Sequence, residues 1–360
     1  MMARSSRRLR TFLLCALASV GMVVVGCFII NSLIDPLWYL RGNVIGEINY
    51  AFNERLAKAN RFLPRMQDYD CVIFGTSRAT MLPTRDIQGH RCFNLAFSDG
   101  QVSEYLPYAR YLRQRGFTPS LLIVEIRRSD LIGPELPAVI PEFIRLGEAP
   151  PSILASYLTL DALHFSIRTL RGDSPHHRFY DKDFEAHLAV RSKRRWYNPA
   201  ATIKPAPPHD VHVERAGLYR QLRQEFPMAH AIGYIAPESA WRVAALSLTS
   251  GFDKYLAVIG EISTGFDQFL DFSVPSPLTT SKLPADTYDG VHYSRAINQR
   301  VWADLLANRS DAALDWRREE PAVTAALLRR RIAEFIATTA GIEVAPKETS
   351  KRQPRSDEGD

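Results

Sequence analysis

The sequence predicts an α/β fold with a doubly wound parallel sheet, and three observations support this prediction. Short runs of apolar and β-type residues end at a glycine, a charged residue or a proline, as buried strands do. Segments with apolar residues at helical spacing lie between these runs, as at residues 240–262, and a further helix is expected at residues 320–339. This alternation of strand and helix is typical of a sheet with helices on both faces. We expect about five strands, at residues 71–74, 92–97, 121–126, 229–237 and 266–273.

The first strand is the most informative because it stops at Gly75 and is followed closely by Ser77. Residues 78–82 can open a helix, which would place the Ser77 hydroxyl at the carboxyl end of a strand and near a helix amino terminus. Ligands bind at that edge of an open α/β sheet. The simpler interpretation is a strand-turn-helix connection in which Ser77 only caps the helix.

A second stretch supplies the two partners that a serine nucleophile needs. Asp289 and His292 are three residues apart on a loop that leads into a helix expected at residues 295–306. A catalytic serine requires a base that takes its proton and an acid that orients the base. At this point the chain resembles the SGNH or GDSL-like hydrolase superfamily. In that superfamily a Gly-x-Ser turn after the first strand is combined with an Asp-x-x-His pair before the last helix.

The resemblance rests on Gly75-Thr76-Ser77-Arg78 and Asp289-Gly290-Val291-His292, and it implies acyl-ester chemistry. Ser77 would attack an ester carbonyl, His292 would take and return the proton, and Asp289 would orient the imidazole. The N–H groups of Ser77 and Gly100 would stabilise the oxyanion. The resemblance implies neither a metal nor a cofactor.

One loop departs from the pattern of the superfamily. Relatives usually carry an asparagine after the third strand as a further oxyanion donor, but this chain has Arg127 and Arg128 there. Either arginine can replace the asparagine and, together with Arg78, would bind an anionic substrate. The alternative is that these residues are only surface charges. The spacing of residues 209–212, His-Asp-Val-His, would suit a metal, but the absence of a nearby Cys or a matching partner argues against a zinc site.

The amino terminus predicts a membrane anchor. Four arginines within residues 4–10 precede an apolar segment at residues 12–30 that is long enough to cross a bilayer as a helix. A cleaved signal peptide is the main alternative, and Cys27 also follows a sequence like a lipoprotein cleavage site. Because residues 28–30 continue the apolar run, we favour an uncleaved anchor. The rest of the chain would then be extracytoplasmic, attached to the inner (cytoplasmic) membrane by a single pass.

Cys71 and Cys92 are the only cysteines outside the anchor. Each begins a strand-like run, and the two runs can be neighbouring strands of the sheet. In an oxidising compartment the pair can form a disulfide, while two buried free thiols remain the alternative.

We divide the chain into six parts: a basic segment (1–10), a transmembrane anchor (11–33), a connector (34–66), an SGNH-like domain (67–308), a helical extension (309–346) and a disordered tail (347–360). Residues 133–227 fit no strand-helix alternation and are interpreted as an insertion in the domain. Its basic and aromatic runs at 176–180 and 191–197 would border the site and suit acidic sugars. The net charge of +6 arises partly from the termini, and no nucleic-acid-binding motif accompanies it.

Membrane-anchored relatives of this kind often transfer or remove O-acetyl groups on envelope polysaccharide. The resemblance therefore implies an O-acyltransferase or esterase whose partners are a cell-envelope glycan, an acyl donor and a membrane O-acyltransferase. A protein of another class is the alternative: one that keeps the fold without catalysis and binds glycan or such an acyltransferase. A hydrogen-bonded Ser77, His292 and Asp289 would favour the enzyme.

Overall fold

The computed structural model describes residues 2–50, 52–134, 137–173, 178–188, 197–200, 203–207 and 210–339. Its centre is a six-stranded sheet with the strand order β3-β2-β4-β7-β8-β9. The strands are β2 (Cys71–Phe74), β3 (Cys92–Asn94), β4 (Leu121–Glu125), β7 (His230–Ile235), β8 (Gln268–Asp271) and β9 (Leu314–Asp315). The first five are parallel and β9 is antiparallel to β8. The predicted α/β fold and its five parallel strands are confirmed.

Helices cover both faces of this sheet. Val72 and Phe74 of β2 point into a core on one face that also contains α3 (Val102–Gln114), α8 (Glu214–Glu225), α9 (Ala240–Ser247), α10 (Phe252–Ser263) and α12 (Pro321–Thr338). Cys71 and Ile73 point to the other face, which α11 (Arg295–Leu306) covers with Val301, Trp302 and Leu305. Because successive side chains of β2 point to opposite faces of the sheet, this strand contributes residues to both cores.

Two helices differ from their predicted form. The segment expected as one helix at 240–262 is α9 and α10, separated by a turn at residues 248–251 that contains Ser250 and Gly251. The helix expected directly after Ser77 is only a 3₁₀ turn, η2 (Ala79–Met81), followed by short η3 (Thr84–Asp86). Pro83 follows η2 closely and has no N–H to extend a helix, so Ser77 has no helix amino terminus beside it.

The connector and the insertion together build a second, smaller sheet. β1 (Ile48–Tyr50) pairs antiparallel with β5 (Arg178–Asp181), which pairs with β6 (Ala186–Leu188). The connector also forms α2 (Glu54–Phe62), whose Phe62 lies in the main core, and η1 (Leu63–Asp68). The insertion contributes α5 (Glu142–Leu146), α6 (Ile153–Tyr157) and α7 (Leu160–Leu170), and the short helix α4 (Arg128–Ile132) directly precedes it.

The predicted bounds of the insertion extend too far. α8 lies within residues 133–227, yet it is the crossover helix between β4 and β7 and packs against α3 and α10 in the main core. The extension after residue 308 also belongs to the fold, since β9 pairs with β8 and α12 packs on α9 and α10. The tail at 347–360 lies outside the described residues.

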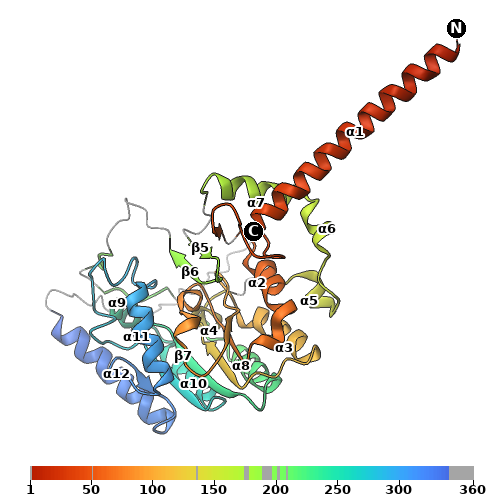
Figure 1. Ribbon diagram of the computed structural model, residues 1–360. Helices are drawn as coiled ribbons and strands as arrows, with labels where there is room; N and C mark the ends of the chain where they lie inside the picture. The colour runs from red at the N-terminus through yellow and green to blue at the C-terminus, as the bar shows by residue number, and fades with distance from the viewer. Residues whose placement is uncertain are drawn as a thin grey trace, which may run out of the picture.

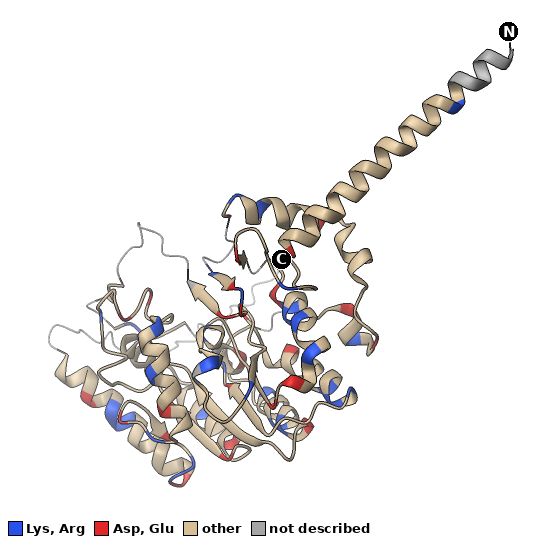
Figure 2. Ribbon diagram, viewed as in Figure 1, with Lys and Arg blue, Asp and Glu red and all other residues tan. Residues whose placement is uncertain are grey.

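The amino-terminal helix α1 (Met2–Ile34) projects away from the domain (Figure 1). Its segment Leu9–Ile34 has a mean hydropathy of 2.7 and is long and apolar enough to cross a membrane. Charged side chains are spread over the helices of the domain, whereas α1 has none beyond Arg10 (Figure 2).

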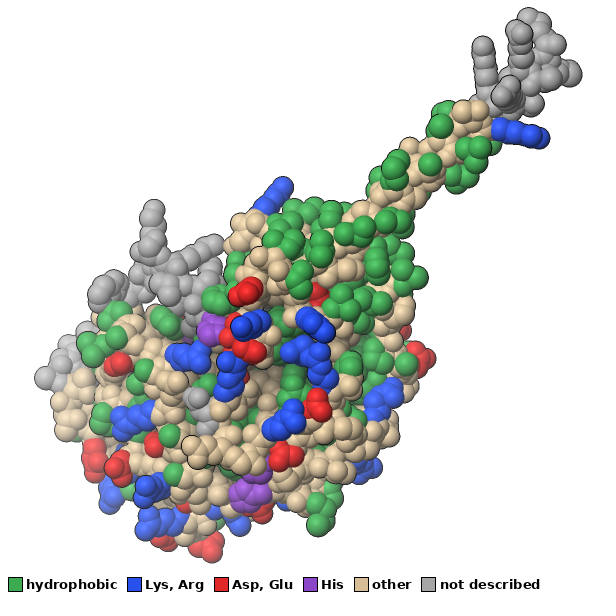
Figure 3. Space-filling view, viewed as in Figure 1, with side chains coloured by type: hydrophobic (Ala, Val, Ile, Leu, Met, Phe, Trp, Pro, Cys, Tyr) green, Lys and Arg blue, Asp and Glu red, His purple; other side chains and the backbone are tan. Residues whose placement is uncertain are grey.

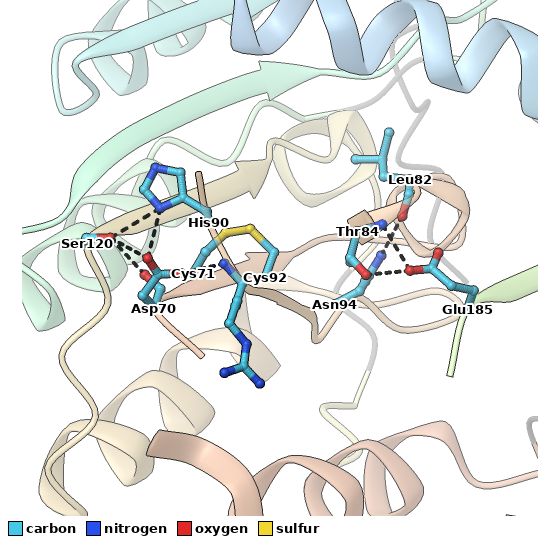
Figure 4. Close-up of a disulfide and its surroundings, with 10 residues drawn as sticks. Asp70, Cys71, Leu82, Thr84, His90, Cys92, Asn94, Ser120 and Glu185 are labelled. Atoms are coloured by element: carbon cyan, nitrogen blue, oxygen red, sulfur yellow. Dashed lines mark hydrogen bonds and ion pairs between the residues drawn. A yellow bond between two sulfur atoms is a disulfide. The ribbon is translucent and has the colours of Figure 1, made fainter. Parts of the chain in front are cut away.

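Cys71 and Cys92 form a disulfide between the neighbouring strands β2 and β3 (Figure 4). Of the two alternatives in the sequence, the bonded pair is confirmed. Together with the apolar helix α1, the disulfide is typical of an extracytoplasmic domain.

The disulfide is expected to stabilise the domain measurably. The bridged residues are 21 apart in the chain. Constraining a loop of that length in the unfolded state is worth about 3 kcal/mol. We expect Cys71→Ser/Cys92→Ser to lower the denaturant midpoint accordingly, with unfolding followed by circular dichroism. Adding reductant should destabilise only the parent protein; an equal effect on the variant would contradict the prediction.

Candidate active site

Ser77, His292 and Asp289 form a hydrogen-bonded chain across the carboxyl edge of the sheet. Ser77 Oγ lies 2.9 Å from His292 Nε2, and His292 Nδ1 lies 2.8 Å from Asp289 Oδ2. Ser77 comes from the turn after β2, and the other two residues come from the loop before α11. Although more than two hundred residues separate them, the parallel topology brings both segments to one edge.

The conformation of the loop fixes the positions of Asp289 and His292 relative to each other. Gly290 has a φ of +78°, a conformation that favours glycine, and it turns the chain so that Asp289 Oδ1 accepts the N–H groups of Val291 (2.9 Å) and His292 (2.7 Å). Burial alone would raise the pKa of Asp289, but the hydrogen bonds from the His292 ring and these N–H groups lower it well below its usual value. Asp289 is therefore a carboxylate that can orient the imidazole.

The Ser77 turn is held by Glu125, a residue that belongs to no sequence motif. Glu125 ends β4 and is fully buried. Its carboxylate accepts the N–H of Thr76 (2.8 Å) and the Thr76 hydroxyl (2.9 Å), and it pairs with the Arg78 guanidinium at 2.7 Å. One buried acid thus fixes the residues on both sides of Ser77. The signal in the sequence is an acidic residue inside an otherwise apolar strand run.

Glu125→Gln is expected to lower catalytic turnover while leaving substrate binding nearly unchanged. An amide cannot accept the same three hydrogen bonds, so Ser77 would be positioned less accurately, and a shift of about 1 Å can cost on the order of 10²-fold. Steady-state kinetics would show the loss in kcat. A loss confined to KM would contradict the positioning role.

The two predicted oxyanion donors differ in their surroundings. The Ser77 N–H donates to no other backbone group among the described residues. The Gly100 N–H donates to the carbonyl of Phe97 at 3.0 Å, so in this conformation it is already engaged. Gly100 is also closely packed, since a Cβ there would lie 2.6 Å from the Tyr105 hydroxyl.

A cleft of about 280 Å³ lies beside Ser77 and His292, and the predicted arginines Arg78, Arg127 and Arg128 all line it. Each is paired with a carboxylate: Arg78 with Glu125 (2.7 Å), Arg128 with Glu238 (2.6 Å), and Arg127 with Asp99 and, at 3.7 Å, Asp130. These carboxylates offset much of the positive charge that the sequence suggested. Arg128 binds Glu238 through Nη2, while its Nη1 is buried with no hydrogen-bond partner among the described residues.

A buried charged cluster contacts the Ser77 turn, and no motif in the sequence marks it. Glu54 of α2 accepts Arg178 Nη1 (2.7 Å) and the Tyr180 hydroxyl (2.8 Å). Arg178 also reaches the carbonyl of Ser77 at 3.4 Å. The connector and the small sheet therefore support the Ser77 turn. Separations of 124 and 126 residues leave no local pattern that could reveal these contacts.

No three His, Cys, Asp or Glu side chains gather to hold a metal within the part of the chain that the structure describes. His212 instead contacts Glu214 Oε1 at 3.1 Å, while His209 lies outside the described residues. The same is true of 176–177 and 191–196 in the two basic and aromatic runs. Tyr197, at the end of the second run, lies against Gly290 in the loop that carries Asp289 and His292.

No protein-family model matches the chain, and no curated protein matches it. Among solved structures, the chain is similar to one described as a "putative platelet activating factor from Streptococcus pneumonia". The similarity covers 66% of this chain and 83% of that chain, with 10% sequence identity and a TM-score of 0.33. A likeness at this level identifies no activity for the present chain.

Proposed function

We propose that the chain is a membrane-anchored, extracytoplasmic serine enzyme of the SGNH type that acts on acyl esters. The observation that carries this proposal is the chain of hydrogen bonds from Ser77 Oγ through His292 to Asp289, at 2.9 and 2.8 Å, beside an open cleft. This is the geometry of a nucleophile, a general base and the acid that orients the base. A binding protein has no need for that alignment.

The reaction proceeds in two halves. Ser77 Oγ attacks the ester carbonyl carbon while His292 Nε2 takes the hydroxyl proton, and the Ser77 N–H stabilises the oxyanion. The ester C–O bond then breaks, and the leaving alcohol receives the proton from Nε2, which leaves an acyl group on Ser77. In the second half, water or a sugar hydroxyl attacks the acyl carbon while His292 Nε2 takes its proton. The bond between the acyl carbon and Ser77 Oγ then breaks, and Nε2 returns the proton to Oγ. Hydrolysis and transfer differ only in that second nucleophile.

We infer that the substrate is an O-acetylated polysaccharide of the cell envelope. Support comes from the apolar helix α1 and the disulfide, which suit a domain held outside the cytoplasmic membrane. The arginine-lined cleft suits a polar substrate. A membrane O-acyltransferase that supplies the acyl donor would be the natural partner.

The test uses the purified full chain in detergent or nanodiscs. We expect turnover of small acetyl esters, together with covalent labelling of Ser77 by a phosphonate ester that reacts with activated serines. Digestion and mass spectrometry would locate the label on the peptide that contains Ser77. If a folded sample shows neither turnover nor labelling with several acyl donors, the proposal fails. A non-catalytic glycan-binding or scaffold protein would then be the better interpretation.

A further inference from the structure

We propose that α6, α7 and the loop at residues 40–45 lie in the extracytoplasmic surface of the membrane that α1 spans, and hold the catalytic domain against the lipid. This inference rests on the membrane placement in the proposed function, but not on the catalytic chemistry. The six exposed residues that form the contact are called the apolar collar: Val44, Ile45, Leu154, Leu158, Leu160 and Leu170.

Besides the exposed Asp161 and His164, α7 exposes large apolar side chains that a helix on a water-soluble domain would bury. Such a helix buries its large apolar side chains and exposes its polar ones. In α7 the outward side chains include Leu160, which is 84% exposed, and Ile167 and Leu170. The buried positions hold small or polar residues, Ala162, Ser166 and Thr169, and Phe165 is partly buried. The outer face of α7 is therefore suited to an apolar environment.

The neighbouring segments extend the same surface. In α6, Ser156 and Tyr157 are buried, whereas Leu154 and the flanking Leu158 are exposed. Val44 and Ile45 are each 61% exposed. Figure 3 shows apolar side chains gathered around the place where α1 enters the domain. Large contiguous apolar surfaces of this kind mark interaction sites.

The apolar collar is attached firmly to the membrane helix. Asn31, near the end of α1, is fully buried and donates from Nδ2 to the carbonyl of Tyr157 in α6 at 2.7 Å. Ser166 of α7 donates to Asn31 Oδ1 at 2.7 Å. The N–H of Val44 donates to the carbonyl of Leu33 at 3.0 Å. These contacts set the position of α6, α7 and the loop relative to α1.

The length of α1 places the apolar collar at the bilayer surface. A hydrocarbon core of about 30 Å takes about 20 helical residues at about 1.5 Å each. Counted from Arg10, the last charged residue of α1, that length ends close to Asn31, where the contacts with α6 and α7 begin. The occupant of the surface is therefore lipid, because the collar is continuous with the segment that crosses the bilayer.

Basic side chains around the apolar collar fit the same orientation. Arg41 and Arg171 are exposed next to it, and the Arg168 guanidinium lies 4.7 Å from the ring centre of Phe52. Arginines beside an apolar surface place their charged ends among lipid headgroups.

The test measures the depth of a fluorescent probe in lipid vesicles. The full chain carries Cys15→Ser and Cys27→Ser, so that one introduced cysteine is the only free thiol while Cys71 and Cys92 remain bonded. An environment-sensitive probe is attached in Leu160→Cys or, independently, in Leu154→Cys. Val323→Cys is the matched control: Val323 is 54% exposed on α12, at the opposite end of the molecule from α1 (Figure 1). The vesicles contain phosphatidylcholine and phosphatidylglycerol, with or without lipids that carry a nitroxide on the acyl chain.

We expect both collar probes to emit at shorter wavelength than the Val323 probe and to lose intensity when nitroxide lipids are present, while the control is unaffected. Water-like emission that the nitroxides do not quench, in protein that resists alkaline extraction, would overturn the proposal. Shielded emission without quenching would also overturn it, because a protein surface would then cover the collar. Release of the protein by alkaline extraction would instead show that α1 is no anchor. The assay does not measure enzyme activity, so its result is independent of whether the proposed catalysis is correct.

Discussion

Ser77→Ala and His292→Ala are each expected to lower kcat for an acetyl ester by on the order of 10⁶-fold, and Asp289→Asn by about 10⁴-fold. The serine and the imidazole take part directly in bond formation and proton transfer, whereas Asp289 acts through the tautomer and orientation of His292. Because the three act as a unit, the Ser77→Ala/His292→Ala double variant should be no slower than either single one. Ester turnover by each purified variant measures these ratios.

The matched control for Ser77→Ala is Ser120→Ala. Ser120 precedes β4 at the amino edge of the sheet, where its hydroxyl contacts Asp70 rather than the cleft (Figure 4). Its variant should retain the wild-type rate. Turnover by Ser77→Ala within a few-fold of the parent would contradict a serine nucleophile.

Glu54→Gln is expected to cost about 3–5 kcal/mol in the free energy of unfolding, the largest effect on stability predicted for this chain. Glu54 is almost fully buried and pairs with Arg178, whose side chain is only 4% exposed. An amide at this position leaves the guanidinium buried without its countercharge. Chemical denaturation followed by fluorescence measures the loss. Glu47→Gln is the control, because Glu47 is exposed, and it should leave the midpoint unchanged.

The same pair predicts how stability depends on pH. Burial alone would raise the pKa of Glu54, but the charges of Arg178 and Lys58 and hydrogen bonds from Ser98 lower it to about 2 from 4.5. A lowered folded pKa means that the contribution is fully present above pH 4.5 and is lost as the pH falls through about 2. Glu54→Gln should therefore show a shallower loss of stability between these values. An unchanged acid slope would contradict the assignment.

Much of the fold followed from local patterns. The five parallel strands were found near their predicted positions because buried strands appear as short apolar runs between turn residues. The helix predicted at 295–306 matches α11 (Arg295–Leu306) and that at 320–339 nearly matches α12 (Pro321–Thr338). The break between α9 and α10 was not predicted, and neither was the shortness of η2. Helix propensity is a weak signal, and tertiary packing overrides it at such turns.

The candidate site likewise contains some residues that were identifiable from the sequence and others that were not. Ser77, Asp289 and His292 were identifiable because two short motifs carry them, and the structure places them within hydrogen-bonding distance. Glu125 and the Glu54–Arg178 pair were not identified, because neither belongs to a motif. The charge on Arg78, Arg127 and Arg128 was visible in the sequence, but their carboxylate partners were not.

By itself, the sequence determined the fold class, the apolar amino-terminal helix and the three residues of the hydrogen-bonded chain. These features depend on periodicity, length and short motifs, which are local properties of a chain. Only the tertiary structure decided that Cys71 and Cys92 are bonded, that Glu125 and Glu54 support the Ser77 turn, and that α7 turns its leucines outward. Each of these depends on which distant segments become neighbours, and on which side of a helix they cover. That information lies in the packing of the whole chain rather than in any one stretch of it.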